Sequence, residues 1–211
     1  MINLNTVLRT TVMACVTFGL TGCVSLLNKT KVAPTVYRLN VPHVVKLVPL
    51  SPAKVINIEI PATSKALRGT DIVLSPDGRR LSAAGGASWS EPVPSLLRNV
   101  LIDTLASRSN LTGVIPKGST RVPYRLNMNI RRFEAVFDQG EDVAPNAIVQ
   151  LNLTLTNTKT RRLIGVHTIQ ASQRASAKSV SSIVSAHDTA TGEAMKKVVD
   201  WLELQLSSGR S

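Results

Sequence analysis

Cys23 is the residue of this chain whose position most clearly predicts a chemical reaction. It closes an N-terminal segment that carries one cation, Arg9, followed by an apolar run over residues 12–20. This order is typical of a secretory leader with a small-residue cleavage site. A cysteine thiol at such a site can accept an acyl chain. The alternatives are an ordinary cleaved leader with a coincidental cysteine, or an apolar N-terminus that is not cleaved.

The residues that end the leader, Leu20-Thr-Gly-Cys23, resemble the bacterial lipobox. The resemblance implies cleavage between Gly22 and Cys23 and attachment of fatty chains such as palmitate to the thiol. A lipid anchor is expected rather than a membrane-spanning helix, which needs about 20 consecutive apolar residues. Several fatty chains bury enough methylene groups for stable attachment to a bilayer.

The residues after the cysteine bear on which membrane carries the anchor. Val24 and Ser25 stand where bacterial lipoproteins retained in the inner membrane usually have an Asp. Their presence indicates sorting to the outer membrane, with the protein lipid-anchored and facing the periplasm. Cys15 leaves with the leader, so the mature chain has no second thiol and no internal disulfide is expected.

No other pattern in the sequence predicts catalysis. The histidines, His43, His167 and His187, are not accompanied by a nucleophile elbow, a zinc-protease motif, a phosphate-binding loop or a cysteine cluster. His187 falls on the apolar stripe of a predicted helix and His167 on a predicted strand, which are positions typical of structural histidines. We therefore predict that the protein is not an enzyme and has neither a metal site nor a cofactor. A hydrolase that uses one of the histidines is the alternative.

The chain is strongly basic, with 25 Lys and Arg against 13 Asp and Glu and a formal net charge of +12. Such a charge suits nucleic acid, anionic lipid head groups or an acidic protein, and it can also serve solubility alone. Nucleic acid is not expected, because only 3% of the residues are aromatic and bases stack on aromatic side chains. The predicted leader, which implies export from the cytoplasm, argues against a nucleic-acid partner as well. Phospholipid, lipopolysaccharide and a protein partner are the leading candidates.

Hydrophobic periodicity predicts two helices and several strands. Apolar residues at spacings of three and four predict a helix over 89–107, capped by Ser90 or Ser95, and a long helix over 180–206 that Gly192 could bend. Alternation at period two predicts strands. The first strand covers 55–60. A hairpin follows, in which a turn at 75–78 joins a strand over 71–74 to a segment around Leu81. The last three strands cover 124–137, with a bulge at Arg131-Arg132, then 147–155 and 163–170.

This order of elements predicts an α+β fold, an α/β sandwich in which two helices pack on one face of a mainly antiparallel sheet. The length fits one domain plus a tether. We predict a leader over 1–22, a lipid-anchored tether rich in proline over 23–52, the α/β domain over 53–206 and a short tail over 207–211. The tether is expected to become ordered near Tyr37.

Several segments, taken in this order, resemble the ABC-type transport auxiliary lipoproteins, the PqiC-like partners of MCE-domain lipid transport systems. They are the leader with Cys23, Tyr37-Arg-Leu39, the strand near 56–60, Trp89-Ser-Glu-Pro92-Val-Pro, Tyr124-Arg-Leu with Phe133-Glu, the 147–155 strand, and Val199-Asp-Trp201-Leu. The segment 75–86 departs from the family by lacking a tyrosine-containing sequence before Trp89. The middle of the last helix departs by its richness in Ala and Thr.

The resemblance implies an outer-membrane lipoprotein that meets an MCE-domain protein of an ABC lipid transporter, and that can form homo-oligomers. The motif residues Trp89, Pro92, Tyr124, Phe133 and Trp201 are then structural or partner-contacting. For both tryptophans we expect a structural role, because large aromatic side chains at element junctions normally bury their area.

Two functions follow from the sequence. The leading one is an auxiliary component of an MCE/ABC-type intermembrane lipid transport system that acts by tethering and docking. The other is an envelope-biogenesis lipoprotein that binds lipopolysaccharide or peptidoglycan through its basic surface.

Overall fold

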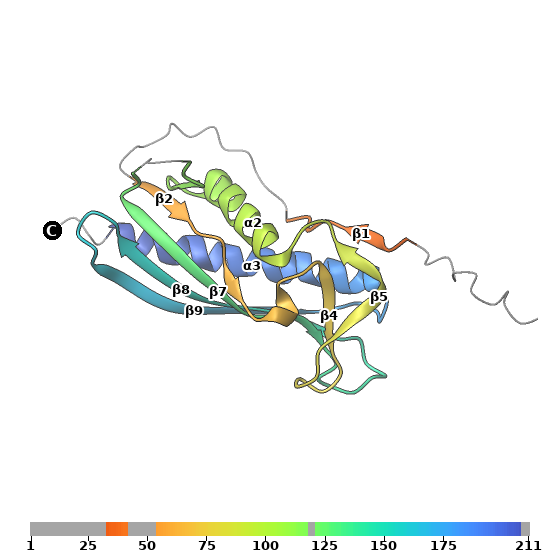
Figure 1. Cartoon of the computed structure of the whole chain (residues 1–211). Helices are drawn as coiled ribbons and strands as arrows, with labels where there is room; N and C mark the ends of the chain where they lie inside the picture. Colours follow the sequence, from red (N-terminus) through yellow and green to blue (C-terminus); the bar gives the residue numbers. More distant parts are fainter. Residues whose placement is uncertain (1–32, 42–53, 118–120, 208–211) are drawn as a thin grey trace, which may run out of the picture. The chain divides into compact units, whose positions relative to one another are not determined.

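The computed structural model describes residues 33–41, 54–117 and 121–207. The chain divides into two compact units, Met1–Ala33 and Pro34–Ser211. The described part of the second unit holds two α-helices, α2 (Val93–Arg108) and α3 (Val180–Ser207), with a nine-stranded sheet. Figure 1 shows the helices and the sheet. The predicted α+β fold class is confirmed.

Three long strands form an antiparallel meander, which is the largest part of the sheet. They are β7 (Tyr124–Val136), β8 (Asn146–Asn157) and β9 (Leu163–Arg174). Alternate residues of β8, from Ala147 to Leu155, are buried, because one face of the meander lies on the core. The alternation seen in the sequence therefore predicts both the strands and the side of the sheet that faces inward.

The predicted bulge in β7 is confirmed by a shift of register between Ile130 and Arg132. Arg131 is exposed at the bulge, whereas Arg132 donates a hydrogen bond from Nε to Oε1 of Glu134 over 2.7 Å. The other carboxylate oxygen of the buried Glu134 accepts from the Phe133 backbone N–H. The bulge thus holds an ion pair, and it allows Phe133 to continue the buried face of the strand.

The other edge of β7 pairs in turn with three short strands, all of them parallel to it. These are β2 (Val55–Ile58), β3 (Ala62–Thr63) and β4 (Asp71–Ser75). A further short strand, β6 (Thr112–Val114), runs parallel to β2 on its outer side. The long strands are antiparallel and the short ones join in parallel, so β7 is the central strand of a mixed sheet.

The predicted hairpin around residues 75–78 is confirmed, with β4 pairing antiparallel to β5 (Ser82–Trp89). Asp77 Oδ1 accepts from the backbone N–H groups of Arg79 and Arg80, and Gly78 has a φ of 74°. Glycine takes this left-handed conformation without the steric cost that a Cβ would add.

The segment near Tyr37, where the tether is expected to become ordered, forms a strand. Thr35–Tyr37 fall within the predicted tether, yet they form β1 and pair in parallel with β5. The Ser90 N–H also donates to the Tyr37 carbonyl, which fixes the end of β1 beside the start of the α2 segment. Backbone pairing therefore brings this short segment into the sheet, although its sequence has no long strand periodicity. Residues 42–52 of the predicted tether lie outside the described residues.

Neither of the predicted caps starts α2. The helix begins after Pro92, which occupies the N-cap position without a side-chain hydrogen bond, and Pro94 lies in the first turn. Ser90 is still engaged with β1 through its backbone, and Ser95 lies inside the helix. The two prolines suit this position because the first N–H groups of a helix have no partner within the helix.

The last helix, α3, packs along β8 and β9 and also contacts α2. Its buried stripe includes Ile183, Ala190, Ala194, Val198 and Leu202, and it continues through Gly192 without interruption. Both helices and the inner face of the meander contribute to one hydrophobic core. Of the predicted tail 207–211, Ser207 ends α3 and 208–211 lie outside the described residues.

Candidate functional site

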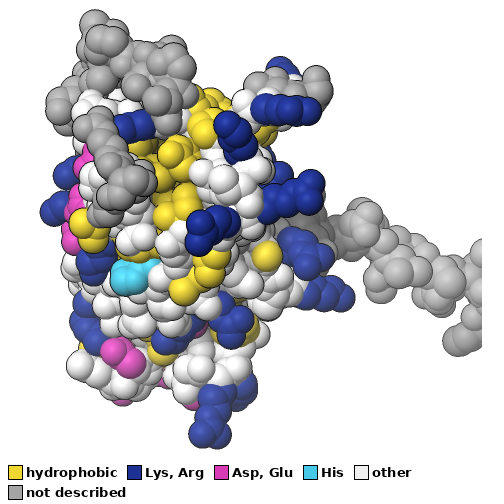
Figure 2. Space-filling model, turned by 90° about the vertical axis from the view of Figure 1, so that its left-hand side faces the viewer, with side chains coloured by type: hydrophobic (Ala, Val, Ile, Leu, Met, Phe, Trp, Pro, Cys, Tyr) yellow, Lys and Arg dark blue, Asp and Glu magenta, His cyan; other side chains and the backbone are white. Residues whose placement is uncertain are grey.

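An open groove of about 1060 Å³ lies at the end of the meander where β7 begins and β8 ends. It is larger than a second hollow of about 450 Å³, which lies beside α2. Figure 2 shows the corresponding side of the molecule, where hydrophobic side chains gather and Lys and Arg side chains surround them. The residues that line the groove are Asn57, Ile58, Glu59, Ile60, Arg98, Ile115, Pro116, Arg121, Val122, Pro123, Arg125, Thr158, Lys159 and Arg161.

The apolar part of the lining comes from three separate pieces of chain. Ile58 ends β2, Ile115 and Pro116 follow β6, and Val122 and Pro123 precede β7. Ile60, just after β2, is 51% exposed, and Ile115 is 48% exposed. Large aliphatic side chains this exposed are costly in water, and when they gather in a hollow they indicate a surface that binds something.

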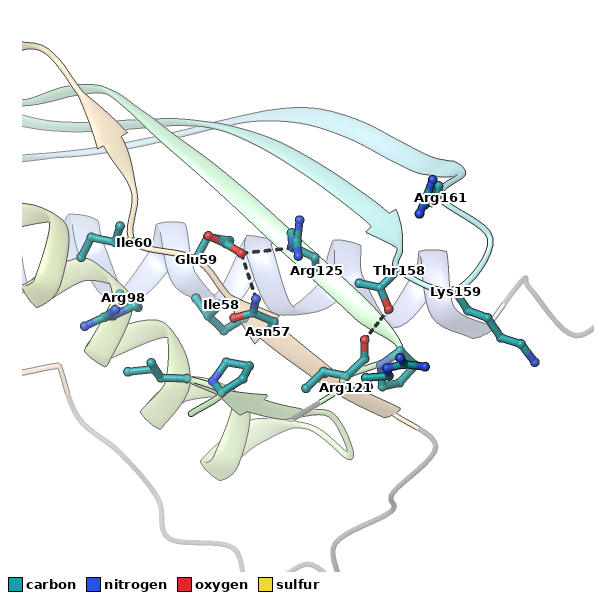
Figure 3. Close-up of a pocket in the computed structure, with 14 residues that line it drawn as sticks. Asn57, Ile58, Glu59, Ile60, Arg98, Arg121, Arg125, Thr158, Lys159 and Arg161 are labelled. Atoms are coloured by element: carbon teal, nitrogen blue, oxygen red, sulfur yellow. Dashed lines mark hydrogen bonds and ion pairs between the residues drawn. The ribbon is translucent and has the colours of Figure 1, made fainter. Parts of the chain in front are cut away.

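The charged part of the lining is almost entirely cationic. It consists of Arg98, Arg121, Arg125, Lys159 and Arg161, against one carboxylate, that of Glu59. That carboxylate is already engaged, because its Oε1 lies 3.1 Å from Arg125 Nε and accepts from Asn57 Nδ2 over 2.9 Å (Figure 3). The four other cations make no ion pair with any residue that the structure describes.

Arg98 differs from the other cations because it comes from α2. Its Nε atom is buried, and no described residue accepts a hydrogen bond from it. A guanidinium presents several N–H donors in a fixed plane and keeps its charge at any physiological pH. Arg98 therefore offers an unused donor on the α2 side of the groove.

The turn between β8 and β9 positions Lys159 and Arg161. Asn157 Oδ1 accepts from the backbone N–H groups of Lys159 and Thr160, both at 3.0 Å, and Arg161 has a φ of 58°. Thr158 joins this turn to the segment before β7, since its N–H donates to the Pro123 carbonyl and its hydroxyl donates to the Val122 carbonyl. Two walls of the groove are therefore fixed to each other (Figure 3).

The motif residues singled out in the sequence lie elsewhere. Trp89, Phe133 and His187 form an aromatic cluster in the core, with ring centroids 4.6 to 5.7 Å apart. Trp89 and His187 are 2% and 1% exposed. Burial lowers the pKa of His187 to about 4, and neither of its ring nitrogens has a partner among the described residues. The cluster is closed to solvent and holds a neutral imidazole.

The other motif residues lie outside this cluster. Trp201 of α3 stacks on the exposed His167 of β9, with ring centroids 5.8 Å apart, and its indole approaches Gly165 closely. Tyr124 begins β7 and is partly buried beside the core, and Pro92 precedes α2. None of these residues lines the groove. Gly22, Cys23 and His43 lie outside the described residues.

The sequence analysis missed the groove, although the residues themselves carry a signal. Basic side chains stand beside apolar ones or prolines in the segment 121–125, and basic residues recur in the turn at 158–162. Each segment by itself looks like an ordinary solvent-exposed loop. Strand pairing of β2 with β7 and of β7 with β8 brings these segments together, and the packing of α2 against β6, which pairs with β2, adds Arg98.

Neither a metal centre nor a spanning helix is found in the described part of the chain. Within residues 33–41, 54–117 and 121–207, no three His, Cys, Asp or Glu side chains are arranged to hold a metal ion. Over those same ranges, no helix combines the length and the apolar character needed to cross a membrane.

Comparison with known proteins decides the family. A family model described as the ABC-type transport auxiliary lipoprotein component matches residues 37–199. The chain belongs to this family. The match begins in β1 and ends within α3, so it spans nearly the whole fold and includes the groove. No curated protein matches the chain.

Solved structures share the fold of this ABC-type transport auxiliary lipoprotein. The protein XCC0632 from Xanthomonas campestris, of family model DUF330, is 18% identical with a TM-score of 0.72, covering 82% of this chain and 97% of its own. An uncharacterized protein is 15% identical with a TM-score of 0.64, covering 81% and 99%. The hypothetical protein CT253 from Chlamydia trachomatis is 9% identical with a TM-score of 0.51, covering 74% and 99%. These likenesses establish the fold.

Proposed function

We propose that this auxiliary lipoprotein is anchored in the outer membrane through acylated Cys23 and serves an MCE/ABC-type intermembrane lipid transport system. In that role it docks an MCE-domain protein and does no catalysis. The observation that carries the proposal is the family match over residues 37–199, joined to a leader that ends in a lipobox.

The position of β1 limits how far the anchored domain can reach. The first residue of β1 is Thr35, 12 residues after Cys23. Since an extended chain spans at most about 3.6 Å per residue, the start of β1 stays within roughly 40 Å of the acylated cysteine. A partner anchored in the inner membrane must then bridge most of the periplasm, which suits a docking role for the lipoprotein.

The absence of catalysis is supported by the chemistry of the groove and of the core. The groove lining offers no cysteine, serine or histidine, and its one carboxylate is paired with Arg125. His187 is buried among aromatic rings, where a substrate has no access.

Acylation is tested by substitution of each cysteine. Cells grown with radioactive palmitate are expected to label the wild-type protein and a Cys15→Ser variant equally, because Cys15 leaves with the leader. A Cys23→Ser variant is expected to lose the label and to disappear from the outer-membrane fraction. Label that persists in Cys23→Ser would contradict the anchor.

The transport role is tested by purification of the full-length protein from detergent-extracted membranes. We expect an MCE-domain protein to co-purify with the wild-type lipoprotein. Recovery of only outer-membrane assembly machinery or peptidoglycan would overturn the proposed partner. Loss of a measurable turnover on substitution of His167 or His187 would contradict the non-catalytic role.

A further inference from the structure

The groove combines an apolar floor with a basic rim, and an amphipathic anion can contact both. We propose that it binds a single anionic phospholipid, with the hydrocarbon on the apolar floor and the phosphate among the basic side chains of the rim. The proposal goes beyond the transport role, since a bound phospholipid requires neither an MCE partner nor a particular membrane.

The floor of the groove suits hydrocarbon. The exposed apolar area comes from Ile60 and Ile115, each about half exposed, with the partly exposed Pro116 and Pro123 beside them, whereas Ile58 and Val122 of the lining are buried. Covering apolar area is worth roughly 25 cal/mol for each Å² removed from water. A volume of about 1060 Å³ lies at the upper end of the range typical of pockets for small organic ligands, so there is room for an acyl chain beside a head group.

The rim of the groove suits a phosphate. Arg98, Arg121 and Arg161 can each present two parallel N–H donors to phosphate oxygens, and Lys159 adds a compact positive charge. Glu59 neutralises only Arg125, over 3.1 Å, so the rest of the rim keeps its charge. The Arg98 Nε donor is buried and unused by any described residue. The rim therefore keeps charge and hydrogen-bond donors that are available to an anionic ligand.

Other occupants match the groove less well. The chain's own segment 42–53 contains Lys46 and no carboxylate, so it cannot neutralise the rim. The groove has no aromatic lining on which nucleic-acid bases could stack. An acidic peptide would satisfy the cations, but most of its surface is polar and would leave the exposed isoleucines without apolar partners.

The test uses the full-length lipoprotein in living cells grown with radioactive phosphate. One variant carries the photocrosslinker p-benzoylphenylalanine in place of Ile60, in the groove. A control variant carries it in place of Val166 of β9, which is 63% exposed and lies outside the groove. After irradiation, the purified protein is expected to carry radioactive phosphate at position 60 and none at position 166, and phospholipase C is expected to remove it.

The rim is tested in the same cells by a matched pair of double variants. Arg121→Glu with Lys159→Glu reverses two exposed rim charges, whereas Arg79→Glu with Lys196→Glu reverses two exposed charges outside the groove. Each pair changes the net charge by the same amount. We expect the rim pair to lower the crosslink at position 60 by roughly tenfold or more and the control pair to leave it unchanged.

Five results would overturn the proposal. Equal label at positions 60 and 166 would mean that the domain rests on a bilayer without a specific site. A label that resists phospholipase C would identify lipopolysaccharide instead, and a crosslink to protein would identify an acidic peptide. Absence of any label, or equal loss in both double variants, would show that the groove holds no phospholipid. Each of these results is independent of whether an MCE protein co-purifies.

Discussion

The aromatic cluster of Trp89, Phe133 and His187 and the basic groove both contain nitrogen atoms that no described residue satisfies. In the cluster these are Trp89 Nε1 and the two ring nitrogens of His187, and in the groove the atom is Arg98 Nε. The cluster atoms belong to neutral groups packed between rings, whereas Arg98 carries a full charge beside an open hollow.

The difference follows from the cost of burying each kind of group. An unsatisfied neutral polar group costs about 1–3 kcal/mol, which a well-packed core can offset. A buried and unpaired charge costs far more, so cations stay where water or a ligand can reach them. The cluster should therefore determine stability, and the groove should determine binding.

The largest effect on stability is expected from Phe133→Ala, which removes a fully buried ring that contacts both Trp89 and His187. The cavity should lower the free energy of unfolding by about 3–5 kcal/mol. Urea denaturation of the purified lipoprotein in a non-ionic detergent, followed by tryptophan fluorescence, measures it. Ile60→Ala in the groove is the matched control and should cost under about 1 kcal/mol. Equal losses would remove the distinction between the two regions.

The next effect concerns pH. Burial lowers the pKa of His187 from 6.5 to about 4. The unfolded chain therefore takes up a proton near pH 6.5 and the folded chain only near pH 4. The contribution of His187 to the free energy of unfolding should fall by roughly 2–3 kcal/mol between pH 7 and pH 4.5, and level off below pH 4.

A His187→Leu variant isolates this effect, because it keeps the other titrating groups. Burial also raises the pKa of the neighbouring Asp188, which works in the opposite direction in both proteins. Denaturation curves of the two proteins at several pH values should diverge only below about pH 6.5. A wild-type stability that does not fall relative to the variant would mean that protons reach the imidazole in the folded state.

A smaller effect is expected from Gly113→Ala in β6, behind the groove floor. An added Cβ would lie 2.8 Å from Leu105 Cδ1 and 3.3 Å from Ile58 Cγ1. Overpacking of this kind should cost about 1–3 kcal/mol in the same denaturation experiment. Gly85→Ala in β5, where nothing lies within 4 Å of the added atom, should cost less than about 1 kcal/mol. A Gly113→Ala variant with an unchanged free energy of unfolding would mean that Leu105 and Ile58 can shift to accommodate the added Cβ.

The smallest effect is expected from the rim itself. Arg121→Glu with Lys159→Glu should change the free energy of unfolding by less than about 0.5 kcal/mol, because both side chains are exposed and neither forms an ion pair with a described residue. The same variant is expected to lose most of its phospholipid crosslink. A large loss of stability would make the rim part of the fold and would weaken the contrast with the cluster.

Much of the fold could be predicted because its main elements have a clear local signal. The alternation in β8 and the spacing of leucines in α2 were sufficient to place both elements and their buried faces. The three short segments β1, β3 and β6 escaped prediction, since strands of two or three residues have no measurable period. The helix cap was also predicted incorrectly, because the backbone of Ser90 pairs with β1.

The sequence by itself determined the α+β class and the resemblance to a family, and it predicts a leader with a lipobox, because each rests on residues close together in the chain. The tertiary structure decided which of the basic residues lie together on one surface. Residues 57–60, Arg98, 115–116, 121–125 and 158–161 are far apart in sequence, and the parallel pairing of β2 with β7 and the antiparallel pairing of β8 with β7 place them around one groove. No local pattern encodes that meeting, since it depends on backbone pairing between distant strands.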